Sequence, residues 1–149
     1  MKTNIILSTD GSCKGNPGPG GYCGILRYKD KELEVAGYEP NATNNRMELK
    51  AVIEPLRRLK RPCNVTVETD SHYVCLGIAK VAEWERNGWK LRSGATPKNV
   101  DLWKEYQSLT TKGNHSIHYQ YTKGHAGDEY NERCDKIAKS QIELHTKGA

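Results

Sequence analysis

Two segments of the chain end in the same way, with an aspartate after a run of β-forming residues. Residues 5–9 (IILST) lead into Asp10, and residues 65–69 (VTVET) lead into Asp70. Small turn residues follow each aspartate, as is typical where a strand ends. If both runs are strands of one sheet, the two carboxylates lie side by side at its edge. Close carboxylates repel each other and raise each other's pKa, so such a pair is typical of a site that binds Mg²⁺.

Two more acidic residues fall beside the apolar stripes of predicted helices. Glu48 lies four residues before Val52, and Asp135 lies three residues before Ala138. An acidic side chain is seldom placed at the buried edge of a helix without a partner. Each acid, taken alone, could simply pair with a cation next to it in the sequence. The candidate cations are Arg46 and Lys50 for the first acid, and Arg133 and Lys136 for the second.

Taken together, the four acids favour a metal site. Two are predicted at strand ends and two on helices that must cover the sheet, so all four could converge on one edge. Two Mg²⁺ ions about 4 Å apart would neutralise them and clamp a phosphodiester for in-line attack by water. Mg²⁺ prefers carboxylates plus substrate phosphate oxygens to an all-protein cage, and this set leaves such positions open.

The order of the predicted elements shows how a sheet could carry these acids. Strands are predicted at residues 4–12, 22–28, 32–38, 65–69 and 116–121, with a broad glycine-rich turn at 15–21. Helices are predicted at residues 43–59, 73–84, 99–109 and 128–142, the first interrupted and kinked by Pro55. Short connections favour an antiparallel arrangement of the first three strands, and crossovers make the others parallel. The fold class is therefore α/β, with a five-stranded mixed sheet flanked by helices.

Composition limits the kind of protein. The chain has 149 residues, so we expect one domain over residues 1–149, with 145–149 as a frayed tail. No apolar run approaches transmembrane length and no signal peptide precedes the first strand, so we expect a cytoplasmic monomer that does not contact membranes. Five cysteines without a C-x-x-C pair predict free thiols. The net charge of +5 is compatible with a nucleic-acid partner.

Four motifs resemble, in order and spacing, those of type 1 ribonuclease H in its bacterial form. They are TDGS (9–12), TNNRMEL (43–49), TDS (69–71) and KGHAG (123–127), the last leading to NERCD (131–135). The resemblance covers nearly the whole chain. It implies the ribonuclease H fold and endonucleolytic cleavage of the RNA strand of RNA–DNA hybrids, leaving 5′-phosphate and 3′-hydroxyl ends.

The resemblance also implies roles for individual residues. Asp10, Glu48, Asp70 and Asp135 match the family's ligands for two Mg²⁺ ions, which Mn²⁺ could replace. His125 matches a loop histidine that assists proton transfer or product release, a role that suits a group titrating near neutrality between glycines.

Substrate contacts are implied in the same way. Thr43 matches a residue of the family's pocket for a DNA phosphate, and residues 81–98 match its hybrid-binding protrusion. The other implied contact residues are Gly11, Ser12, Cys13, Asn16, Asn44, Asn45, His72, Trp84 and Trp89. Asn44 could instead cap its helix.

The chain departs from the family pattern at three places near the substrate, one of them Pro40 and Asn41, where the loop before the helix often has arginine. His72 stands where bacterial relatives carry glutamine. In the protrusion, four cations are opposed by two acids, so we expect a weaker hold on the hybrid than in strongly basic relatives. These residues are Arg86, Lys90, Arg92 and Lys98 against Glu83 and Glu85.

Three other classes of protein share some of these features. Sugar kinases and actin-like ATPases have a similar Asp-Gly turn, but they need two such domains. A resolvase-like or integrase-like nuclease of the same fold would space its acids differently and lack the Gly-His-Ala-Gly loop. A non-catalytic hybrid-binding module would be favoured if one of the four acids were missing, and none is.

Overall fold

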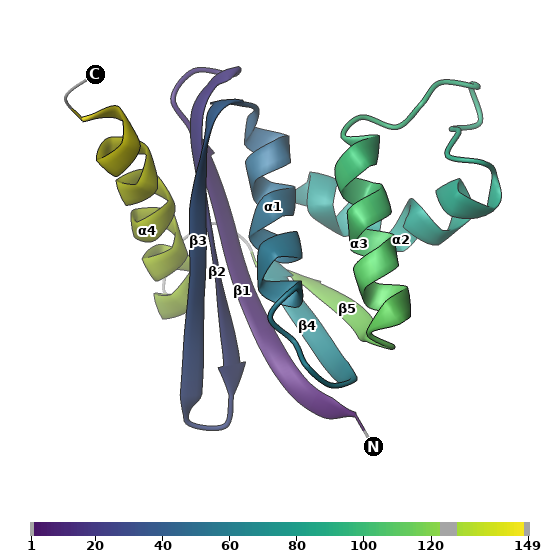
Figure 1. Ribbon diagram of the computed structural model, residues 1–149, viewed down its shortest axis with the longest axis horizontal. Helices are drawn as coiled ribbons and strands as arrows, with labels where there is room; N and C mark the ends of the chain where they lie inside the picture. The colour runs from purple at the N-terminus through teal and green to yellow at the C-terminus, as the bar shows by residue number, and fades with distance from the viewer. Residues whose placement is uncertain (1, 123–127, 148–149) are drawn as a thin grey trace.

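The protein forms one five-stranded sheet with helices on both faces (Figure 1). The structure is a computed structural model that describes residues 2–122 and 128–147. Its elements, in chain order, are β1 (Thr3–Cys13), β2 (Gly18–Tyr28), β3 (Lys31–Ala42), α1 (Asn44–Leu56), β4 (Cys63–Thr69), α2 (His72–Arg86), α3 (Val100–Lys112), β5 (Ser116–Tyr121) and α4 (Glu129–Thr146).

The strand order is β3-β2-β1-β4-β5, which makes β1 the central strand. The first three strands pair antiparallel, while β4 runs parallel to both β1 and β5. This arrangement confirms the predicted mixed sheet. Because β1 and β4 are parallel neighbours, their carboxyl ends lie at the same edge of the sheet.

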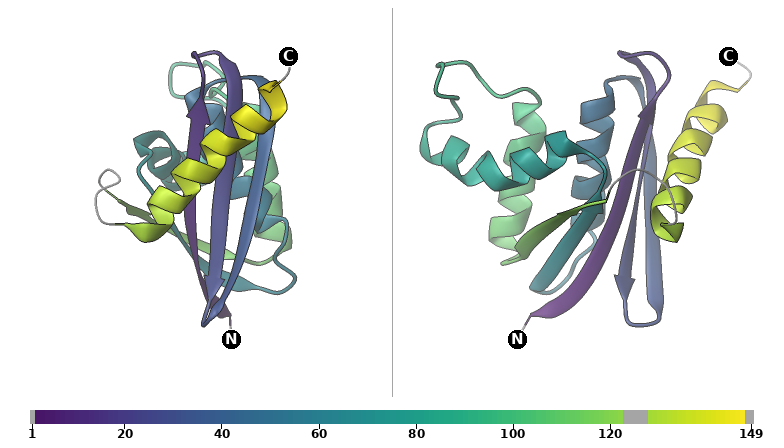
Figure 2. Two further views of the ribbon diagram at one scale, coloured as in Figure 1. Left: turned by 90° about the vertical axis from the view of Figure 1, so that its left-hand side faces the viewer. Right: turned by 180° about the vertical axis from the view of Figure 1, so that it is seen from behind.

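The helices divide unequally between the two faces of the sheet. Helices α1, α2 and α3 cover one face, and α4 lies alone on the other (Figures 1 and 2). The larger core lies under the three helices, where Leu7, Val65 and Val67 pack with residues such as Val52 and Trp103. A smaller cluster joins α4 to β2 and consists of Cys23, Ile25 and Cys134, with Tyr130 and Ile137 against it.

Several predicted boundaries are wrong, and two of them have a clear physical reason. The glycine-rich turn is shorter than predicted, because Gly20 and Gly21 already pair with β1 as part of β2. Helix α1 ends at Leu56 and does not reach Leu59. Pro55 lies in its last turn, and beyond it the Arg58 N–H bonds to the Pro55 carbonyl and the Leu59 N–H to the Leu56 carbonyl, in tighter i→i−3 turns.

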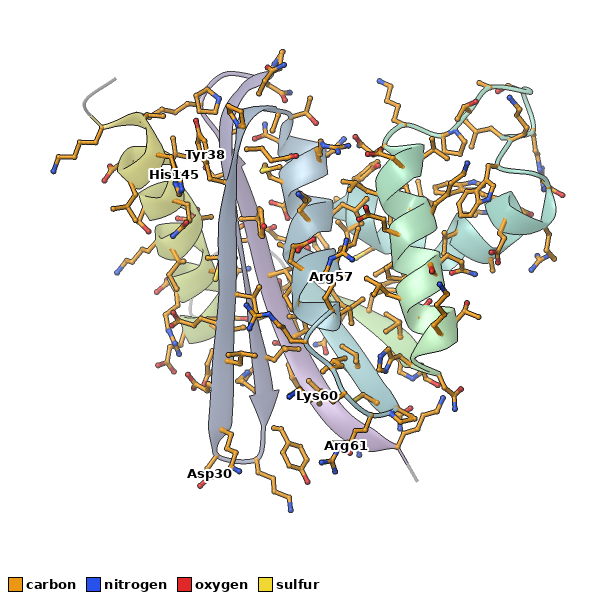
Figure 3. The ribbon with its side chains drawn as sticks, in the orientation of Figure 1. Asp30, Tyr38, Arg57, Lys60, Arg61 and His145 are labelled. Atoms are coloured by element: carbon orange, nitrogen blue, oxygen red, sulfur yellow. The ribbon has the colours of Figure 1, made fainter. Side chains whose placement is uncertain are left out.

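The first two residues of the predicted tail, 145 and 146, belong to α4 in the structure. Helix α4 continues to Thr146, and the His145 ring stacks on Tyr38 of β3 with centroids 4.4 Å apart (Figure 3). The contact between the two rings anchors the last turn of α4 to the sheet.

Two compositional predictions can be examined in the structure. All five cysteines are free thiols. Among the described residues, no helix combines the length and the apolar character needed to cross a membrane.

Candidate active site

Three of the four predicted acids meet where β1 and β4 end. Asp10 belongs to β1, Asp70 follows the last residue of β4, and Glu48 projects from α1. One carboxylate oxygen from each lies within 4.8 Å of the other two. The parallel pairing of β1 with β4 accounts for the two aspartates, and helix α1 adds the glutamate.

Gly11 explains how α1 can approach the sheet closely enough. A side chain at Gly11 would place its Cβ 2.5 Å from the Glu48 backbone nitrogen, a distance that real Cβ atoms do not reach. The Gly11 N–H lies 3.0 Å from both Asp10 Oδ1 and Glu48 Oε1 and can donate to either. One backbone amide therefore orients two of the three carboxylates.

The start of α1 is fixed by Thr43. Its hydroxyl accepts a hydrogen bond from the Arg46 N–H at 3.2 Å, which makes Thr43, and not Asn44, the N-cap. The cap sets the position of Glu48, which lies in the second turn of the helix.

The carboxylates crowd one another strongly enough to shift a pKa. Burial, followed by the charges of Asp10 and Asp70, raises the pKa of Glu48 well above its ordinary value. The Gly11 N–H opposes this shift only in part. A divalent cation would offset the repulsion, and three carboxylates in one place are the hard oxygen ligands that Mg²⁺ favours. The residues present therefore fit a divalent metal ion.

Asp135 does not join this close set. It lies on α4, and its Oδ2 accepts a hydrogen bond from Lys139 Nζ at 3.1 Å. Its side chain is 26% exposed. The sequence suggests Arg133 or Lys136 as the partner of Asp135. The ion pair in the structure is instead with Lys139, one helical turn after Asp135.

Of the two histidines predicted at the site, the structure describes one. His125 lies outside the described residues. His72 is the first residue of α2, and its ring stacks on Tyr121 with centroids 4.1 Å apart and an interplanar angle of 15°. Tyr121 was not predicted as a site residue. Its pairing in register with Thr69, which places it beside Asp70, is a tertiary feature that no local pattern in the sequence indicates.

Several predicted substrate contacts lie together at one groove. Asn16, Thr43, Asn44 and Asn45 line it with Lys98 and Asn99. The Asn16 side-chain oxygen accepts a hydrogen bond from the Asn44 N–H at 3.0 Å, which joins the β1–β2 turn to α1.

The other predicted contacts near the acids form the end of β1 and are Gly11, Ser12 and Cys13. The Cys13 thiol bonds to backbone carbonyls of Gly18 and Ala42, so its sulfur is occupied within the fold.

The two tryptophans of the protrusion help to hold it together. Both are partly buried and pack against the main core. Trp84 meets Trp103 edge to face at 5.8 Å, and Lys104 Nζ lies 5.8 Å from the centre of the Trp89 ring. The four cations of this segment are exposed, and two of them, Lys90 and Arg92, line a groove with Trp84.

Known proteins resemble this chain over almost its full length. Residues 2–143 match the family model of RNase H. The ribonuclease H of Polaromonas sp. is 48% identical over 95% of this chain and 90% of its own length. That of Thermoanaerobacter pseudethanolicus is 49% identical over 96% and 92%, respectively.

A solved structure agrees in three dimensions. The crystal structure of a type 1 RNase H with the type 2 active-site motif superposes with a TM-score of 0.84. It is 31% identical and the match covers 99% of this chain and 76% of that one. With the three clustered acids and the mixed sheet, these matches show that the chain belongs to the ribonuclease H family.

Proposed function

We propose that the protein is a metal-dependent endoribonuclease that hydrolyses the RNA strand of RNA–DNA hybrids to 5′-phosphate and 3′-hydroxyl products. The observation that carries the proposal is the cluster of Asp10, Glu48 and Asp70, whose carboxylate oxygens lie within 4.8 Å of one another. Membership of the ribonuclease H family supplies the substrate class.

The same cluster is the proposed metal site. Asp10, Glu48 and Asp70 would hold the metal, and Asp135 would complete a second position. We assign two Mg²⁺ ions, with Mn²⁺ as a substitute. When bound, such ions neutralise the developing charge on a phosphodiester and activate water. The protein's own part is to hold the carboxylates in place, which it does through the Gly11 N–H and the Thr43 cap.

Binding of the hybrid would use polar groups along the edge of the sheet. Thr43 would hold a phosphate of the DNA strand, and the asparagines of the groove and the end of β1 would read the minor groove, where the 2′-hydroxyl distinguishes RNA from DNA. His72, Trp84 and Trp89 would support the rest of the duplex, and His125 would assist proton transfer or product release. We place this activity in one catalytic domain, residues 1–149, that acts as a monomer in the cytoplasm.

The test compares three labelled substrates in Mg²⁺ and in EDTA: an RNA–DNA hybrid, duplex RNA and duplex DNA. We expect cleavage of the hybrid alone, in Mg²⁺ alone, with products that carry 5′-phosphates. Cleavage of duplex DNA, or hybrid cleavage that survives EDTA, would contradict the proposal. Hybrid binding without cleavage would identify a non-catalytic module instead.

A further inference from the structure

A connected set of polar side chains lies on the sheet face that α4 covers, and Arg27 is at its centre. The Arg27 Nη2 atom donates to Glu68 Oε1 at 3.1 Å and to Ser8 Oγ at 3.3 Å. Ser8 Oγ also donates to Glu68 Oε1 at 3.2 Å. Ser8 and Glu68 each lie two residues before an acid of the cluster, Asp10 and Asp70 respectively. Arg27 therefore links the two strands that carry these aspartates.

The same arginine contacts the start of α4. Its guanidinium lies over the Tyr130 ring, 3.7 Å from the centroid. The Tyr130 hydroxyl donates to Glu32 Oε1 of β3 at 2.6 Å. The hydrogen bond from Tyr130, followed by the one from Arg133, lowers the pKa of Glu32, as expected for a carboxylate that stays ionised in this network.

Arg133 fastens the next turn of α4 to the same strand. It donates to Glu32 Oε2 at 2.9 Å and to Glu34 Oε1 at 2.7 Å. The following residue, Cys134, is fully buried, and its thiol donates to the Ser8 carbonyl at 3.3 Å. Asp135 comes next. The backbone that carries Asp135 is thus held against β1 and β3 by the two residues before it.

We propose that Arg27 is a positioning residue that places Asp135 relative to Asp10 and Asp70, and so sets the affinity of the metal site. The inference rests on the proposed function, because it takes Asp135 to be a metal ligand. Isolated ion pairs at a surface contribute little, but here one guanidinium shares partners on β1, β4 and α4. Groups that orient metal ligands typically change metal affinity by about 10- to 100-fold when removed.

The test is a double-mutant cycle on Mn²⁺ affinity, followed by electron paramagnetic resonance of the free ion. The variants are Arg27→Met, Asp135→Asn and the double variant. Methionine removes the guanidinium and keeps an unbranched apolar side chain. We expect Asp135→Asn to weaken Mn²⁺ binding by about 10-fold or more and Arg27→Met to weaken it by a smaller factor, because Arg27 acts on the ligand through other residues. In the Asp135→Asn background, Arg27→Met should have little further effect, because Arg27 acts through Asp135.

Arg57→Met is the matched control. Arg57 also bridges two carboxylates, Glu54 at 3.1 Å and Glu105 at 2.7 Å, but it lies between α1 and α3 on the other face of the sheet (Figure 3). This variant should bind Mn²⁺ like the unmodified protein. A second readout is the Mg²⁺ concentration for half-maximal hybrid cleavage, which should rise in Arg27→Met while KM for the hybrid at saturating Mg²⁺ stays constant.

Several results would overturn the inference. It fails if Arg27→Met and Arg57→Met bind Mn²⁺ equally, if the effects of Arg27→Met and Asp135→Asn add, or if Asp135→Asn leaves Mn²⁺ binding unchanged. If Arg27→Met does not fold, Tyr130→Phe removes a single hydroxyl from the network and must weaken Mn²⁺ binding by a smaller factor. If the cycle behaves as expected but no hybrid is cut, the proposed function is wrong and the positioning role stands.

Discussion

The clustered carboxylates, those of Asp10, Glu48 and Asp70, repel one another in the folded protein when no metal ion is bound. Burial first, and then the charges of Asp10 and Asp70, raise the pKa of Glu48 well above its ordinary value. Because the folded protein favours the neutral form of Glu48 more than the unfolded chain does, the metal-free protein loses stability as the pH rises through the ordinary pKa of a glutamate towards its raised value in the fold. Function and stability of the metal-free protein are therefore opposed at these residues.

The Asp10→Asn substitution separates the effect of the cluster on activity from its effect on the stability of the metal-free protein. It should lower hybrid cleavage by more than about 100-fold, since loss of a ligand costs more than loss of a group that orients one. It should also raise the melting temperature in EDTA, by a larger amount at pH 8 than at pH 5, because Glu48 is more ionised at the higher pH. Activity assays and thermal denaturation at both pH values measure these changes.

Asp30→Asn is the control for Asp10→Asn. Asp30 lies in the exposed β2–β3 turn, at the far end of the sheet (Figure 3). The Asp30→Asn substitution should alter neither hybrid cleavage nor the pH dependence of the melting temperature. Near-normal activity of Asp10→Asn would refute the assignment of Asp10 to the metal site.

At the scale of elements, α2 and α3 are joined by a close contact between a glycine and a tryptophan. A Cβ on Gly77 of α2 would lie 2.0 Å from the ring of Trp103, which is fully buried in α3. Trp103 Nε1–H also donates to the Tyr73 hydroxyl at 2.9 Å, so the ring cannot move aside without losing that bond. This contact fixes how the protrusion is attached to the rest of the fold.

Gly77→Ala should therefore destabilise the protein by about 1 to 3 kcal/mol, the usual cost of adding volume to a packed core. Helix propensity alone predicts the opposite sign, a gain of about 1 kcal/mol. Urea denaturation decides between the two. A more stable variant would show that α2 and α3 are not in close contact at this position.

The sequence predicts the elements better than it predicts their contacts. Hydrophobic periodicity and the Thr-Asp couplets place all five strands and four helices and bring Asp10, Glu48 and Asp70 to one edge. The strand status of Gly20 and Gly21 depends on pairing with β1, which outweighs their local turn preference. The contacts of Arg27 and Tyr121 cannot be predicted locally, because their partners come from distant parts of the chain.

At the scale of the whole molecule, exposed cations that contribute to the net charge of +5 lie at two ends of the fold. Lys90 and Arg92 are exposed in the segment between α2 and α3, while Lys60 and Arg61 lie at the opposite end, near the start of β1 (Figure 3). Only cations that meet the duplex release counterions from its phosphates, so the salt dependence of binding reports which end is used.

Replacing Lys90 and Arg92 by glutamine should weaken hybrid binding. It should also reduce the slope of log affinity against log salt by about 1 to 2, since each phosphate contact contributes close to one. The matched pair Lys60→Gln and Arg61→Gln should leave the slope unchanged. Fluorescence anisotropy with a labelled hybrid in EDTA measures the affinity and its salt dependence for both pairs of variants. An equal effect of the two pairs would mean that the protrusion is not the binding end.

Helix α4 covers its face of the sheet alone, so the helices on the two faces are attached to the sheet to different extents. Its buried apolar residues are Cys134, Ala138 and Ile142, and polar contacts of Tyr130 and Arg133 add to its attachment, whereas the three helices opposite share one larger apolar core. A helix that covers one face of a sheet alone can open as a separate unit, because no other helix shares its contacts. Detachment of α4 would remove Asp135 while β1 and β4 stayed paired. Warming would therefore abolish activity before the sheet unfolds. The highest temperature at which the protein is active would lie below its melting temperature.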